Sequence, residues 1–101
     1  FFLESPTNPT LEVYDIAAIC RIAKKTGIKV VVDNVFATPM MQSPLQLGAD
    51  CVVYSTTKHI DGQGRCLGGV ILGSKQFIQD NVYQYLRQTG PAMSPFNAWV
   101  V

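Results

Sequence analysis

Apolar and polar positions along the chain follow two alternating periods, and this alternation predicts an α/β protein. Short continuous apolar runs, typical of strands buried on both faces of a sheet, occupy residues 1–4, 28–33, 51–55 and 67–72. Between these runs, apolar residues recur at helical spacing. The spacing predicts helices over residues 13–25, from Ser74 to about Gln88, and from Ser94 onwards.

Glycine, proline and serine mark the ends of the predicted helices. Gly27 is a typical carboxyl-terminal stop, Ser74 a typical amino-terminal cap, and Pro95 occupies the first helical position that proline tolerates. Residues 34–41 are expected to be irregular, residues 56–65 to form a polar loop, and residues 44–48 to form a short helix.

The order of these elements implies a mostly parallel sheet with helical connections. The connection between Ser55 and Leu67 is too short for a crossover helix, so the last strand is expected to be antiparallel. Too few helices are present to cover both faces of such a sheet. We therefore expect the 101 residues to be an excerpt from a larger subunit.

Composition narrows the possible partners. The formal net charge is only +1 and no stripe of lysine or arginine occurs, which argues against nucleic-acid binding. No apolar stretch reaches transmembrane length. Cys20, Cys51 and Cys66 are too widely spaced to predict a disulfide framework or a zinc site, and reduced cysteines fit a cytoplasmic protein. Cys20 and Cys51 are expected in the core.

Three polar side chains follow predicted strands closely: Asn8, Asp33 and Lys58. In open α/β sheets, ligands bind outside the carboxyl ends of the strands, so these residues predict a ligand site at one edge. Lys58 is placed to attack a carbonyl, and burial favours the uncharged amine that such attack needs. A carboxylate at Asp33 suits a pyridinium nitrogen, so the pair indicates pyridoxal phosphate chemistry. The simpler alternatives are a solvated lysine and a turn-capping aspartate.

Hydroxyl groups near the lysine extend this hypothesis. Ser55 and Thr57, two residues apart on an extended segment, could donate hydrogen bonds to a phosphate from one side, or could simply end a strand. The glycines of residues 61–65 lack the P-loop ending and suit a tight turn. Arg65 is expected to pair with a structural carboxylate rather than with substrate. His59, the only histidine, does not predict a metal site.

Four motifs together resemble the pyridoxal-phosphate-dependent enzymes of cysteine and methionine metabolism. They are Glu-Ser-Pro-Thr-Asn-Pro at 4–9, Val-Val-Asp-Asn-Val-Phe-Ala-Thr-Pro at 31–39, Ser-Thr-Thr-Lys at 55–58, and Ser-Pro-Phe-Asn-Ala-Trp at 94–99. Within that family, Asp-Gly-Gln-Gly-Arg at 61–65 resembles the O-succinylhomoserine sulfhydrylases. His59 departs from the tyrosine that most members have after the lysine.

The resemblance implies the aspartate-aminotransferase-like fold type I, with this chain as the central part of the large cofactor-binding domain. It implies that Lys58 forms the imine with pyridoxal 5'-phosphate, that Asp33 partners the pyridine nitrogen, and that Asn8 lies near the ring hydroxyl. Ser55 and Thr57 are then phosphate contacts, and the Asn8–Pro9 bond is expected to be cis.

The resemblance also implies a reaction and an assembly. The expected reaction is γ-replacement on O-succinylhomoserine or O-acetylhomoserine with sulfide, giving homocysteine. Cystathionine synthesis, and elimination by a cystathionine lyase or methionine γ-lyase, are alternatives within the family. An inert α/β interaction module is the alternative outside it. The partners implied are a small amino-acid substrate and further copies of the chain in a homotetramer built from dimers.

Overall fold

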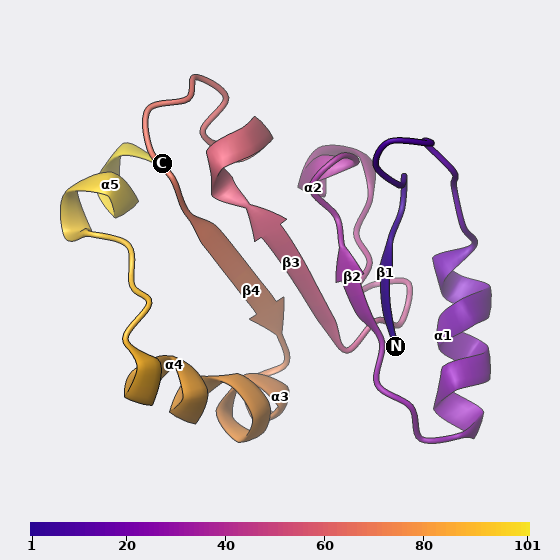
Figure 1. Ribbon diagram of the computed structural model, residues 1–101. Helices are drawn as coiled ribbons and strands as arrows, with labels where there is room; N and C mark the ends of the chain where they lie inside the picture. Colours follow the sequence, from indigo (N-terminus) through magenta and orange to yellow (C-terminus); the bar gives the residue numbers. More distant parts are fainter.

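The computed structural model describes residues 1–101 as a four-stranded sheet with helices packed around it (Figure 1). The strands lie side by side in chain order: β1 (Phe2–Glu4), β2 (Val31–Asp33), β3 (Cys51–Ser55) and β4 (Gly69–Gly73). β1, β2 and β3 are parallel, and β4 is antiparallel to β3. The four predicted strands and the reversal of the last one are confirmed.

The helix α1 (Ile16–Lys25) covers one side of the parallel strands. Its inward residues Ile16, Cys20 and Ala23 recur at helical spacing. They form the core with Leu3 of β1, Val32 of β2, Val30 just before β2 and Ala49 in the loop before β3. Asp15 caps the helix, since its Oδ1 accepts a hydrogen bond of 2.8 Å from the Ala18 amide. The helix therefore begins later than the predicted residue 13.

The second helical region is one rod built from α3 (Lys75–Ile78), a π-helical turn η2 (Gln79–Tyr83) and α4 (Gln84–Thr89). Ser74 caps it as predicted, with its hydroxyl 3.0 Å from the Phe77 amide. Gly90, at φ +76°, ends it. Ser94 likewise caps α5 (Pro95–Val100). Figure 1 shows the rod beyond the end of β4, away from the loop that joins β3 to β4.

Three predictions for the segments between the strands were wrong. A short helix α2 (Thr38–Met41) lies in the stretch expected to be irregular, and Thr56–Ile60 form a π-helical turn, η1, instead of a polar loop. Residues 44–48 form consecutive turns rather than a helix, because the amides of Gln46, Leu47 and Gly48 bind carbonyls three residues back. None of the helices is long and apolar enough to span a membrane.

Candidate functional site at the carboxyl edge of the sheet

Strand register brings the predicted site residues to one edge. Glu4 pairs with Asp33, and Asp33 pairs with Val53, so β1 and β2 end level with each other. β3 continues to Ser55, and the turn η1 follows at once with Lys58 in it. Asp33, Ser55 and Lys58 are therefore gathered at the carboxyl ends of neighbouring parallel strands, as the sequence predicted.

Asp33 has two distinct carboxylate oxygens. Oδ1 accepts a hydrogen bond of 3.0 Å from the Val35 amide, so the turn-capping alternative is confirmed for this atom. Oδ2 makes no hydrogen bond within the chain, and Asp33 is in neither of the chain's two ion pairs. One oxygen thus fixes the side chain at the strand end, and the other remains available to a ligand.

Lys58 sits at an irregular point of η1. Its backbone has φ −87° and ψ −117°, outside the helical region, between neighbours that form the turn. The side chain is exposed and makes no ion pair in this chain, so the expected burial of the lysine was wrong for these 101 residues. The ammonium group is consequently uncommitted to any other residue here.

The hydroxyl groups before Lys58 differ in their contacts. The Ser55 hydroxyl makes no hydrogen bond within the chain. Thr57 Oγ1 accepts a bond of 2.9 Å from the Gly68 amide and donates one of 3.2 Å to the Gly68 carbonyl. Thr56 Oγ1 is buried and has no partner. The segment turns after Ser55, so the extended geometry expected for Ser55 and Thr57 was wrong beyond Ser55.

Asn8 lies in the exposed loop after β1. Its backbone amide donates to Glu4 Oε2 at 3.1 Å, while its side chain makes no hydrogen bond within the chain. The Asn8–Pro9 bond is cis, as expected, and the Ser5–Pro6 bond is cis as well. Asn8 follows β1 and Asp33 ends β2, and these two parallel strands end level with each other.

A buried amide network behind the site was missed in the sequence. Asn34 is fully buried, and its Nδ2 lies 3.2 and 2.9 Å from the carbonyls of Thr38 and Gln42 and 2.8 Å from the Tyr54 hydroxyl, so that three oxygens share its two N–H donors. Gln42 Nε2 returns a bond of 2.7 Å to Asn34 Oδ1 and reaches the Ser5 carbonyl at 2.9 Å. The only local signal was an asparagine after a strand, which turns also favour.

Arg65 pairs with Asp61, so the structural partner expected for it is confirmed. Arg65 Nε lies 2.8 Å from Asp61 Oδ1, and the Arg65 amide lies 2.7 Å from Asp61 Oδ2. These contacts hold the pKa of the Asp61 carboxyl below its ordinary value, with the Arg65 backbone amide as the largest cause. His59 is exposed and makes no hydrogen bond.

The cysteines behave as core residues. Cys20, Cys51 and Cys66 are all buried and unpaired. Burial, with a smaller contribution from the charge of Asp50, raises the pKa of the Cys20 and Cys51 thiols. These two thiols are therefore less reactive than a free cysteine.

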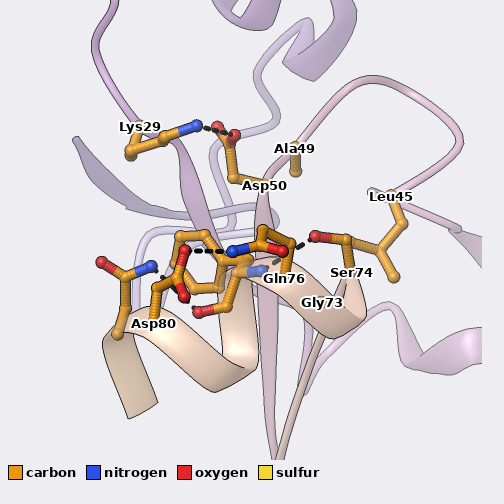
Figure 2. A pocket seen from close by; sticks show the side chains of 10 residues that line it. Lys29, Leu45, Ala49, Asp50, Gly73, Ser74, Gln76 and Asp80 are labelled. Carbon is orange, nitrogen blue, oxygen red and sulfur yellow. Dashed lines mark hydrogen bonds and ion pairs between the residues drawn. The ribbon is translucent and has the colours of Figure 1, made fainter.

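An open cavity of about 520 Å³ lies at the opposite edge of the sheet (Figure 2). Its polar groups largely satisfy one another, because Lys29 Nζ binds Asp50 Oδ1 at 2.9 Å and Gln76 binds Asp80. None of the predicted site residues lines it. The predicted site residues thus lie away from this cavity, at the carboxyl ends of the strands, where ligand sites of open sheets occur.

Comparison with known proteins identifies the family. The family described as Cys/Met metabolism PLP-dependent enzyme matches residues 1–101. The chain belongs to this family. An O-succinylhomoserine sulfhydrylase of Mycobacterium tuberculosis is 58% identical over 100 residues, and an L-methionine gamma-lyase of Pseudomonas putida is 44% identical over 98; these cover 99% and 96% of this chain.

Solved structures of the family share the fold. The apo structure of a methionine gamma lyase from Micromonospora echinospora superimposes with a TM-score of 0.93 at 40% identity, over 98% of this chain and 27% of that one. The α/β fold with a mostly parallel sheet is therefore that of fold type I pyridoxal-phosphate enzymes. The chain spans about a quarter of the length of these relatives, since it covers 25% of each curated relative named above.

The polar groups at the carboxyl ends of the strands suit pyridoxal phosphate. The group needs an amine for its aldehyde, a carboxylate for its ring nitrogen and donors for its phosphate. Lys58 offers a free amine, Asp33 a free carboxylate oxygen, and Ser55 a free hydroxyl, while Thr56 contributes a buried hydroxyl without a partner. The groups at these strand ends are thus of the chemical kinds that the cofactor needs.

Proposed function

We propose that the whole enzyme catalyses γ-replacement on O-succinylhomoserine, or O-acetylhomoserine, with sulfide as the incoming nucleophile. The products are homocysteine and the free acid of the acyl group. The relative at 58% identity, an O-succinylhomoserine sulfhydrylase, carries the proposal, because it exceeds the 44% of the methionine gamma-lyase over nearly the same residues. The motif at residues 61–65 supports the same choice.

Each site residue has a proposed task. Lys58 Nζ would hold the cofactor covalently, and its amine would take a proton from the substrate α-carbon and move protons between carbons. Asp33 holds a proton on the ring nitrogen. Ser55 and Thr57 would bind the phosphate, and Asn8 would contact the ring hydroxyl. When bound, pyridoxal phosphate supplies the electron sink for the α-carbon.

Thr57 qualifies the phosphate site. Its hydroxyl already donates to the Gly68 carbonyl, so binding a phosphate oxygen requires that the hydroxyl turn away from that carbonyl. Ser55 needs no such change. We therefore assign the larger share of phosphate binding by this segment to Ser55.

The decisive experiment replaces Lys58 in the full-length enzyme. Lys58→Ala is expected to abolish the yellow absorbance of covalently bound cofactor and to lower turnover at least about a hundredfold, because both the anchor and the proton carrier are lost. Lys75→Ala, which removes an exposed lysine far from the sheet edge, is the matched control. Persistence of the absorbance and turnover in Lys58→Ala would show the assignment to be wrong.

Elimination is the second candidate reaction, because the methionine gamma-lyase relative is also 44% identical to this chain over 98 residues. Assays with O-succinylhomoserine plus sulfide, with cystathionine and with methionine separate the two. The proposed function predicts the highest kcat/KM for the first substrate. A higher kcat/KM for methionine or cystathionine would favour the lyase reaction.

We further propose that the 101 residues form part of a large cofactor-binding domain in a cytoplasmic homotetramer built from dimers. Exposed large apolar side chains support the packing of this chain against further protein, among them Met40, Met41, Leu67 and Trp99, each at least 80% exposed. Light scattering of the full-length enzyme after size exclusion tests the assembly, and a monomeric mass would contradict it.

A further inference from the structure

The loop that carries Lys58 is fastened on both sides of the lysine. Before it, Thr57 is tied to Gly68 through its hydroxyl and through a backbone bond of 3.4 Å from the Thr57 amide to the Gly68 carbonyl. After it, Asp61 is tied to Arg65. Lys58 therefore lies between two anchoring points within one turn of the chain.

The anchor at Asp61 is connected directly to the backbone of the lysine. The Asp61 amide donates to the Thr56 carbonyl at 2.9 Å, and the Gly62 amide donates to the Lys58 carbonyl at 2.8 Å. These bonds hold the irregular backbone angles at Lys58. Because a side chain leaves the chain in a direction set by those angles, the position of residues 61 and 62 bears on where the amine points.

The carboxylate of Asp61 is what fixes residues 61 and 62. Its side chain has no exposed area, and both oxygens are bound by Arg65, one by the amide and one by the guanidinium. Arg65 Nη2 also donates to the Asp61 carbonyl at 3.3 Å. Between the two residues, Gly62 and Gly64 have φ of +69° and +66°, so the turn contains its two most pliable positions.

We propose that Asp61 is a positioning residue for Lys58. By closing the glycine-rich turn onto Arg65, its carboxylate sets the direction in which the Lys58 amine leaves the loop. The inference rests on the proposed function, since the amine matters only if it binds the cofactor. A residue that merely stabilised the loop would change how much protein folds, without changing how the folded protein uses its lysine.

A matched pair of variants in the full-length, cofactor-loaded enzyme tests this. Asp61→Asn removes the charge that binds the guanidinium of Arg65. Asp50→Asn does the same to a carboxylate with similar contacts, since Asp50 binds the Lys29 ammonium and the Val30 amide, each at 2.9 Å, at the opposite edge of the sheet. Circular dichroism and cofactor content establish that equal amounts of folded, loaded enzyme are compared.

The readout is the share of bound cofactor that borohydride fixes covalently to the chain, with kcat and KM measured beside it. For Asp61→Asn we expect this share to fall and kcat to drop about tenfold or more, with KM little changed, because a small displacement of a reacting group has such effects. Asp50→Asn should match the wild type within about twofold. Arg65→Lys keeps the backbone bond but removes the guanidinium contacts to Asp61 Oδ1 and to the Asp61 carbonyl. It is the second variant if Asp61→Asn does not fold, and the same fall in the fixed share and in kcat is expected for it.

Two contrary outcomes are distinguishable. If the wild-type enzyme shows no borohydride-fixable cofactor, the proposed function is wrong and the positioning role falls with it. If the wild type is normal while Asp61→Asn, or Arg65→Lys where Asp61→Asn does not fold, behaves like Asp50→Asn, only the positioning role is overturned.

Discussion

The amide of Asn34 connects three segments beneath the candidate site. Its donors reach the beginning and the end of α2 and the hydroxyl of Tyr54 on β3, and Gln42 extends the contact to the Ser5 carbonyl in the loop after β1. All of these groups lie behind the strand ends that carry Asp33 and Ser55. A buried network of this kind favours one arrangement of the segments, because each unpaired member would be costly.

Asn34→Leu should destabilise the full-length enzyme by about 2 kcal/mol or more, because the apolar side chain leaves buried carbonyl and amide groups without partners. Asn81→Leu is the control, since Asn81 makes one comparable bond of 2.9 Å to the Phe77 carbonyl on an exposed helix surface. Urea unfolding followed by fluorescence measures both. Equal, small losses for the two variants would contradict the structural role assigned to Asn34.

At the scale of single elements, the strands and helix caps could be predicted and the short loops could not. Strands β1 to β4 and the caps Ser74 and Ser94 depend on periods and residue types within a few positions, which the sequence displays directly. The helix α2 depends instead on Asn34 and on backbone contacts that no periodicity records. The turn η1 depends on Gly68, eleven residues beyond Thr57.

Asp15 tests the capping account at this scale. Asp15→Ala should cost about 1 kcal/mol of stability, because the Ala18 amide at the start of α1 loses its acceptor. Asp15→Asn should cost much less, since asparagine caps helices about as well as aspartate. Thermal or urea unfolding of the full-length enzyme measures the difference. A loss of the same size in both variants would point to the charge rather than the cap.

At the scale of the whole molecule, two carboxylates with lowered pKa values, Asp50 and Asp61, make the stability of the fold depend on pH. Burial alone would raise the pKa of Asp50, but hydrogen bonds from the Val30 amide and the Lys29 ammonium outweigh it and leave the value lowered. The pKa of Asp61 is lowered as well. A depressed native pKa stabilises the fold above the ordinary value of about 3.9, and this contribution is lost as the pH falls through the native value.

Asp50→Asn should therefore be less stable than the wild type at neutral pH, and the difference should shrink as the pH falls below about 4. Denaturant midpoints measured across this range give the answer. A difference that stays constant into the acid range would mean that the carboxylate charge is not the source of the stabilisation.

Because β4 runs antiparallel to β3, the loop that joins the two strands can change without changing how the strands pair. β3 and β4 remain joined by five residue pairs, from Cys51 with Gly73 to Ser55 with Gly69. The segment that carries Lys58 follows β3 at one end of this pair of strands, and the α3–α4 rod follows β4 at the other end. Substitutions that keep the pair of Asp61 and Arg65 can thus change the other residues of this loop while the register of β3 and β4 stays intact.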